Sequence, residues 1–134
     1  DRIAERLSTD VSLPAGGQGA VGIECRLNDD KTLTRLGCLH HTDTAARVVA
    51  ERAMNAKLNG GCQVPIACFA ELNTSEAAAG ELSLRGLVGS ADGKRMLRAE
   101  ARGSSAAAEA LGIEVAEALL AQGAAELLAE LDER

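Results

Sequence analysis

A turn signal with alternating apolar residues on both sides constrains the fold of this chain more than any other feature. The turn is Asp92-Gly93, a pair favoured in β-hairpins because it tolerates the positive φ angles that tight hairpin turns need. Before it, Leu82, Leu84 and Val88 define one strand, and residues 96–102 form another. The sequence therefore predicts two neighbouring antiparallel strands.

A third strand is predicted over residues 63–72. Alternate positions are apolar and share one face: Val64, Ile66, Cys68, Ala70 and Leu72. Pro65 cannot donate a hydrogen bond to a neighbouring strand, so this strand lies at an edge of the sheet or begins there. In the 96–102 strand the charged side chains share a face that we expect to meet solvent: Arg98, Glu100 and Arg102.

Helices are predicted on both sides of these strands. The first is capped by Thr42 or Asp43, and its inner face is predicted at helical spacing: Ala45, Val48, Val49, Ala53 and Ala56. Arg47 and Glu51 are expected to form a surface ion pair, and Gly60 to provide a left-handed C-terminal cap.

The second helix is opened by Ser104 or Ser105 and broken by Gly123. We expect these residues to face inward, the last three in a final turn or two: Leu111, Val115, Ala118, Leu119, Leu127, Leu128 and Leu131. The chain has 26 alanines and one aromatic residue, Phe69, which favours closely packed helices on a small sheet. The predicted fold is α+β, with a small three-stranded antiparallel sheet and its helices in residues 41–134.

The first 40 residues follow a different pattern. Residues 1–7 resemble the end of an amphipathic helix, and residues 14–22 contain four glycines and one proline. A short strand is expected where Val21, Ile23 and Cys25 alternate with other residues, followed by a brief helix that Asp29 or Asp30 caps. The helix carries Leu33, Leu36 and Leu39. Because it has no initiator Met, the chain is expected to be part of a longer protein. Residues 1–39 are expected to promote self-association, since a lone strand exposes unpaired backbone groups.

Charge and hydropathy exclude two classes of function. The chain has 20 acidic residues against 14 Lys and Arg, and its net charge is −6, so nucleic-acid binding is disfavoured. No apolar run approaches the ~20 residues that a transmembrane helix needs. Four cysteines without a secretory signal favour reduced thiols and an intracellular location.

The cysteines are Cys25, Cys38, Cys62 and Cys68. No pair has metal-ligand spacing and the only histidines, His40 and His41, are adjacent, so no metal site is predicted. The two histidines are expected to cap the following helix or to lie in a solvated linker.

Cys62 differs from the other three cysteines. Cys25, Cys38 and Cys68 occupy apolar positions of predicted elements, so we expect them to pack in the core. Cys62 follows two glycines in a loop, where an accessible thiol can act as a nucleophile or carry a covalent group. An ordinary loop cysteine is the alternative.

Three stretches of this sequence resemble the porphobilinogen deaminase family. They read LPA-GQGAVGIECR over residues 13–15 and 17–26, HHTDTAARVVAERA over residues 40–53, and LNGGCQVPI over residues 58–66. The last contains the family's Gly-Gly-Cys-x-x-Pro motif. By this resemblance, Cys62 carries a dipyrromethane cofactor through a thioether, and Gln18 and Gly19 are candidate cofactor contacts.

The resemblance also implies a domain plan and a reaction. Residues 1–13 would end a second domain, residues 14–40 would cross back to the first, and residues 41–134 would form a C-terminal cofactor-attachment domain. The family's enzymes condense four porphobilinogen molecules, with release of ammonia, and hydrolysis then frees hydroxymethylbilane while the primer stays. The family's catalytic aspartate and substrate-binding cations lie upstream, so no catalytic residue is assigned here and this chain alone is expected to be inactive.

Two other functions stay open from the residues themselves. The chain could be a free-standing α+β interaction or small-ligand module without catalysis. A thiol redox protein would need a second cysteine near Cys62; Cys68 is the only close candidate, and its alternation places it on the inner face of the sheet.

Overall fold

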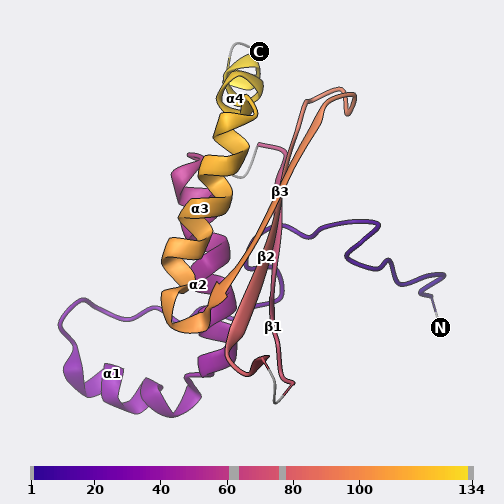
Figure 1. Cartoon of the computed structure of the whole chain (residues 1–134). Helices are drawn as coiled ribbons and strands as arrows, with labels where there is room; N and C mark the ends of the chain where they lie inside the picture. Colours follow the sequence, from indigo (N-terminus) through magenta and orange to yellow (C-terminus); the bar gives the residue numbers. More distant parts are fainter. Residues whose placement is uncertain (1, 61–63, 76–77, 133–134) are drawn as a thin grey trace.

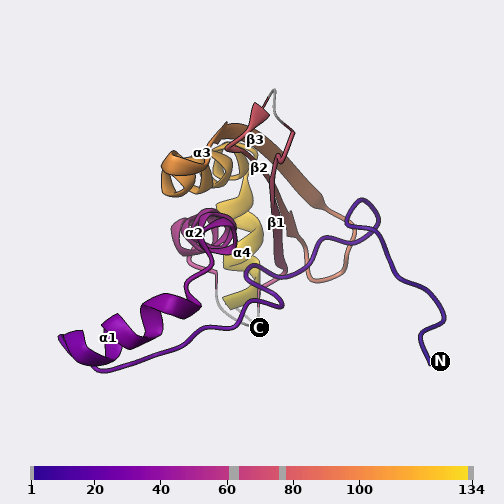
Figure 2. The ribbon, with the colours of Figure 1, turned by 90° about the horizontal axis from the view of Figure 1, so that it is seen from below.

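A three-stranded antiparallel sheet with helices on one face forms the centre of the molecule (Figures 1 and 2). The computed structural model describes residues 2–60, 64–75 and 78–132. The strands are β1 (Ile66–Leu72), β2 (Glu81–Gly89) and β3 (Met96–Ser104), in the order β1-β2-β3. The predicted α+β fold is confirmed, and β1 lies at an edge as Pro65 indicates.

The hairpin between β2 and β3 forms where the Asp-Gly pair predicts it. Gly93 has a φ of +71°, and the Ser90 N–H donates to the Arg95 carbonyl at 2.9 Å across the loop. The Asp92 carboxylate accepts hydrogen bonds from the Ser90 hydroxyl and the Lys94 N–H, which lower the pKa of Asp92. The register pairs Leu84 with Ala101, which leaves the charged face of β3 exposed as predicted.

Helices α2 (Thr42–Lys57) and α3 (Ala108–Ala121) pack side by side on the face of the sheet opposite the charged side chains of β3. Helix α4 (Ala124–Asp132) follows α3 (Figure 2). Gly123, with a φ of +97°, separates α3 from α4 as predicted. The Ser104 hydroxyl caps the short 3-10 helix η3 (Ser105–Ala107) that leads into α3. The largest buried side chains of this core are Met54, Leu82, Leu84, Leu119, Leu127, Val88, Val115 and Cys68.

Three details of the predicted helices are wrong. In α2 the buried apolar stripe is Ala50, Met54 and Leu58, whereas Val49 and Ala56 are exposed. In α3 Ala118 is exposed, because Ala116 and Gly112 occupy the inner face instead. Alanine gives little contrast between helix faces, so the larger Met and Leu side chains determine the orientation. The side chain of Leu131 is outside the part that the structure describes.

Both ends of α2 also differ from expectation. His41, rather than Thr42 or Asp43, is the N-cap, and its Nδ1 accepts a hydrogen bond from the Thr44 N–H at 3.2 Å. The predicted capping role of the histidine pair is therefore confirmed for His41. At the C-terminal end, Asn59 adopts the left-handed conformation, with a φ of +53°, in place of Gly60.

Residues 2–39 form little regular structure. Asp29 caps α1 (Asp30–Leu36), which continues into the 3-10 helix η1 (Gly37–Leu39), and α1 lies away from the sheet (Figure 1). The helix expected over residues 1–7 is absent from residues 2–7, and residues 20–26 are extended but form no strand. A short isolated helix is marginal in water, and a strand needs a partner strand to satisfy its backbone groups.

Candidate functional site

Cys62, the predicted attachment residue, lies outside the described residues together with Gly61 and Gln63. The chain on either side of them is held firmly. The Pro65 carbonyl accepts a hydrogen bond from the Gly89 N–H at 2.9 Å, which ties the start of β1 to the end of β2. Gly60 is tied to α2 on the other side.

Asn55 holds Gly60 through its backbone and its side chain. The Gly60 N–H donates to the Asn55 carbonyl, and the Asn55 Nδ2 donates to the Gly60 carbonyl, each at 2.9 Å. A Cβ on Gly60 would collide with the Asn55 side chain and would stand 2.9 Å from the Ile66 Cδ1. A glycine is needed here because of this close approach, and the segment that contains Cys62 starts from a fixed point.

Gln18 and Gly19 lie in an exposed turn over residues 15–20. The Gln18 N–H donates to the Ala15 carbonyl and the Ala20 N–H donates to the Gly17 carbonyl, both at 3.1 Å. Gly17 and Gly19 have φ angles of +72° and +84°, which favour glycine. A Cβ on either would meet nothing within 4 Å, so the turn leaves open space beside its backbone.

Glu51 connects this turn to the edge of the sheet. It is only 6% exposed, and its Oε2 accepts a hydrogen bond from the Gly17 N–H at 2.6 Å. Its Oε1 accepts one from the Ala70 N–H of β1 at 2.8 Å. The predicted Arg47–Glu51 surface pair is therefore wrong: Glu51 is buried, and the Arg47 Nε has no hydrogen-bond partner among the described residues.

The segment before the turn packs against β1 as well. The Cys68 N–H donates to the Pro14 carbonyl at 3.0 Å, so Pro14 and Glu51 together satisfy two outward-facing donors of this edge strand. Gly16 lies over the Cys68 side chain, and a Cβ on Gly16 would be 2.8 Å from the Cys68 Sγ. The close contact makes this position specific for glycine.

Further upstream, Arg85 holds the chain against the outer face of the sheet. Its guanidinium donates to the Asp10 carboxylate and to the Thr9 hydroxyl, each at 2.7 Å, and pairs with Glu71 at 3.0 Å. It also lies over the ring of Phe69, 5.8 Å from the centroid. Residues 9–17 thus follow the sheet before the chain leaves it.

The described cysteines divide into one buried thiol and two exposed ones. Cys68 is 1% exposed as predicted, and burial, followed by the negative charge of Glu51, raises the pKa of its thiol to about 12. A thiol that stays protonated is a poor redox partner for Cys62. Cys25 and Cys38 are exposed, so their predicted core positions are wrong; the segments that carry them have no apolar layer to pack against.

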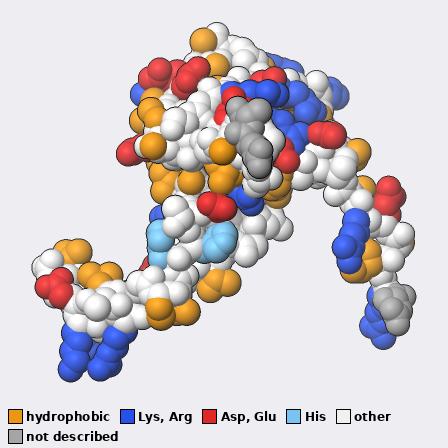
Figure 3. Space-filling view, turned by 60° about the horizontal axis from the view of Figure 1, so that its bottom comes forward, with side chains coloured by type: hydrophobic (Ala, Val, Ile, Leu, Met, Phe, Trp, Pro, Cys, Tyr) orange, Lys and Arg blue, Asp and Glu red, His pale blue; other side chains and the backbone are white. Residues whose placement is uncertain are grey.

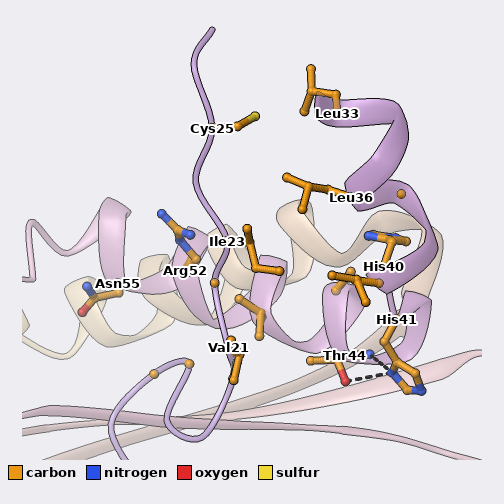
Figure 4. Close-up of a pocket in the computed structure, with 18 residues that line it drawn as sticks. Val21, Ile23, Cys25, Leu33, Leu36, His40, His41, Thr44, Arg52 and Asn55 are labelled. Atoms are coloured by element: carbon orange, nitrogen blue, oxygen red, sulfur yellow. Dashed lines mark hydrogen bonds between the residues drawn. The ribbon is translucent and has the colours of Figure 1, made fainter. Parts of the chain in front are cut away.

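An open cleft of about 720 Å³ lies between residues 16–25, α1 and the face of α2 that runs from Thr44 to Asn55 (Figure 4). Val21 and Ile23 line it from the extended segment, and Leu33 and Leu36 face them from α1. Arg52, on α2, is a cation in this lining. The cleft is therefore largely apolar, and Arg52 adds a positive charge to it.

Both histidines lie where the arm that contains α1 joins the folded body of residues 42–132 (Figure 3). His40 lines the cleft, while His41 caps α2 and its Nδ1 lies 2.9 Å from the Thr44 hydroxyl. Over residues 2–60, 64–75 and 78–132 no group of three or more His, Cys, Asp or Glu side chains could hold a metal ion. Within the same residues, no helix is long and apolar enough to cross a membrane.

Glu51 and Asn55 are the residues that sequence reasoning missed. Glu51 lies three positions before Met54 and seven before Leu58, so helical geometry places all three on one face. Recognising that stripe would have placed the carboxylate inside. Asn55 carried no comparable signal, because its partner is defined by the path of the chain after the helix.

A comparison with models of known protein families finds a match to the sequence of this domain. The family model described as porphobilinogen deaminase, C-terminal domain, matches residues 45–121. The match begins in α2 and ends with α3, so it includes the sheet, Glu51, Asn55 and the Gly-Gly-Cys-x-x-Pro motif at residues 60–65.

Proposed function

Because the chain belongs to the porphobilinogen deaminase family, we propose that it is the primer-carrying part of a hydroxymethylbilane synthase. The enzyme would be a cytoplasmic transferase of tetrapyrrole biosynthesis that joins four porphobilinogen molecules and releases ammonia at each addition. The observation that carries this proposal is the family match across the Gly-Gly-Cys-x-x-Pro motif, whose cysteine is Cys62.

The described residues on either side of the Cys62 segment suit the attachment of a dipyrromethane. The cofactor would supply a primer onto which the pyrrole chain grows while it remains tethered. Asn55 fixes Gly60, the first residue of the motif, and the Gly89 N–H fixes Pro65, its last residue. The open backbone of the 15–20 turn and the guanidinium of Arg52 are suited to the cofactor's acidic side chains.

A tether lowers the cost of each addition because only one partner then has to be brought from solution. In this proposal Cys62 holds the primer, and the residues of the 15–20 turn help to orient it. Positioning of substrate carboxylates and proton transfer at the pyrrole nitrogens would come from upstream residues, in keeping with the net charge of −6 in this part. We therefore expect that the 134-residue chain alone carries a free Cys62 thiol and forms no hydroxymethylbilane.

The intact mass of the full-length protein tests the proposal. The wild-type protein should exceed its sequence mass by two pyrrole units, and the Cys62→Ser variant should carry no adduct. Cys25→Ser is the matched control, because Cys25 is an exposed thiol, and it should keep the adduct. Retention of the thioether-bound adduct by Cys62→Ser would disprove the assignment. Absence of the adduct from the wild-type protein would favour the alternative, a module without catalysis.

A further inference from the structure

The Glu51 carboxylate is buried, and a charge in that position needs specific partners. A carboxylate loses much hydration free energy on burial unless hydrogen bonds replace the lost water. Here both oxygens accept backbone N–H groups, Oε2 from Gly17 and Oε1 from Ala70. Both oxygens of an ionised carboxylate accept hydrogen bonds, so each can pair with one of these two N–H groups. A side-chain amide has only one oxygen, and its NH2 group would face the other N–H donor.

These two hydrogen bonds join three parts of the chain. Glu51 belongs to α2, Ala70 to the edge strand β1, and Gly17 to the 15–20 turn. The turn is otherwise held by hydrogen bonds within itself and by the Pro14 carbonyl just before it. Glu51 is therefore the side chain that anchors the turn carrying Gln18 and Gly19.

We propose that Glu51 is a positioning residue for primer extension, because it anchors the 15–20 turn at a fixed place beside the domain that contains Cys62. This inference rests on the proposed function. Gln18 and Gly19 would contact the cofactor in this arrangement, and Glu51 would act only through them. Both Glu51 oxygens accept backbone N–H groups and the residue is only 6% exposed, so a role in holding the turn fits Glu51 better than proton transfer to a substrate.

Amide hydrogen exchange in the 134-residue chain, read by NMR, tests the anchor directly. In the wild type, the Gly17 amide should exchange more slowly than the amides of Gly19 and Gly22. In Glu51→Gln one N–H must face an amide NH2 group, so Gly17 should exchange faster by about ten-fold or more. Glu114→Gln is the matched control, because Glu114 is exposed on α3, and it should leave Gly17 unchanged.

A second variant loosens the same contact without changing Glu51. In Gly16→Ala the new Cβ meets the Cys68 Sγ and should displace the turn, so the Gly17 amide should again exchange faster. Adding Cys68→Ala removes the sulfur and should restore slow exchange. If Gly17 keeps its protection in both Glu51→Gln and Gly16→Ala, the anchor is disproved.

Turnover in the full-length enzyme separates positioning from folding. The rate is measured at a temperature at which every variant is folded. It is divided by the amount of primer-loaded enzyme, which intact mass gives. Glu51→Gln should lower kcat by about ten-fold with KM within about two-fold, since the substrate-binding residues are untouched. The Gly16→Ala variant should lower kcat likewise, and its Cys68→Ala partner should restore it.

Different results identify different failures. If the wild-type enzyme carries no primer and forms no hydroxymethylbilane, the proposed function is rejected. The Gly17 exchange result would then show only that Glu51 anchors the turn structurally. Active wild type with Glu51→Gln equal to Glu114→Gln in kcat would overturn the positioning role even if Gly17 exchange is faster. Loss of kcat together with faster Gly17 exchange supports it.

Discussion

The Cys68 thiol shows how the fold determines the chemistry of a single residue. Its side chain points into the core from β1, next to Gly16 and the backbone of Glu51. Burial and the adjacent carboxylate both disfavour the thiolate, so the pKa rises from 9.0 to about 12. Cys25 and Cys38, in contrast, are exposed.

This raised pKa predicts a loss of stability at alkaline pH. Below about 9 the thiol is protonated in both states and its contribution is fully present; between 9.0 and about 12 only the unfolded thiol ionises. The free energy of unfolding should fall by up to about 1.4 kcal/mol per pH unit in that window. Urea unfolding of wild type and Cys68→Ala, measured at increasing pH, checks this.

Removing the thiol should make the pH dependence shallower. Cys68→Ala should be less stable at neutral pH by about 1–2 kcal/mol, because a small cavity remains, and should lose less stability above pH 9. Cys38→Ala, at an exposed site, should follow the wild-type pH dependence. Parallel curves for wild type and Cys68→Ala would contradict the raised pKa.

At the scale of elements, the contact between α2 and α3 depends on Gly112. A Cβ at this position would collide with the Ala50 carbonyl and stand 2.7 Å from the Ala53 Cβ and 3.0 Å from the Met54 nitrogen. These neighbours are mostly backbone, so rotation of a side chain cannot relieve the overlap. The two helices approach closely because this residue has no side chain.

Gly112→Ala should therefore destabilise the protein by about 2–3 kcal/mol or more, because the helices must separate and expose their alanine-rich contact. The gain in helix propensity of about 1 kcal/mol does not offset this. Urea unfolding gives the measurement. Gly37→Ala is the control: a Cβ there meets nothing within 4 Å, and its free energy of unfolding should change by less than about 1 kcal/mol.

The strands follow directly from the sequence, whereas the orientation of α2 is indicated only by its few large side chains, such as Met54. The period of two and the Asp-Gly turn predict β2 and β3, because a register slip would reverse their buried faces. In α2 the small alanines lie on several sides, so the sequence pattern has little contrast, and the burial of Glu51 depends on donors from distant segments. A strand over residues 20–26 depends on a partner strand, which the pattern of one segment cannot reveal.

The candidate site divides in the same way. Accessibility after two glycines pointed to Cys62, and the family motif agrees; its attachment role stays a prediction, as do the cofactor contacts of Gln18 and Gly19. Asn55 and Glu51 could not be identified by composition, because their roles depend on tertiary contacts with Gly60 and Gly17.

At the scale of the whole molecule, most of the large apolar side chains that are exposed lie in residues 2–39, outside the folded body. Val21 and Leu27 are 90% and 91% exposed, and Leu33 of α1 and Leu39 of η1 are exposed as well. The backbone of residues 20–26 is extended and forms no strand with the described part of the chain. An exposed apolar patch next to unpaired backbone groups favours association with another copy.

We therefore expect the 134-residue chain to self-associate through residues 20–39, either by pairing the extended segments of two copies or by exchanging them. Sedimentation velocity over a concentration series should show a monomer–dimer equilibrium. Combining Val21→Asp with Leu33→Asp places charges in the cleft and should shift the equilibrium to monomer. Val11→Asp, at a site that is 74% exposed outside this segment, should leave it unchanged. A wild-type chain that stays monomeric at all concentrations would contradict this expectation. If Val11→Asp shifted the equilibrium as much as the Val21→Asp, Leu33→Asp double variant, the change in net charge and not the loss of these apolar side chains would explain the effect.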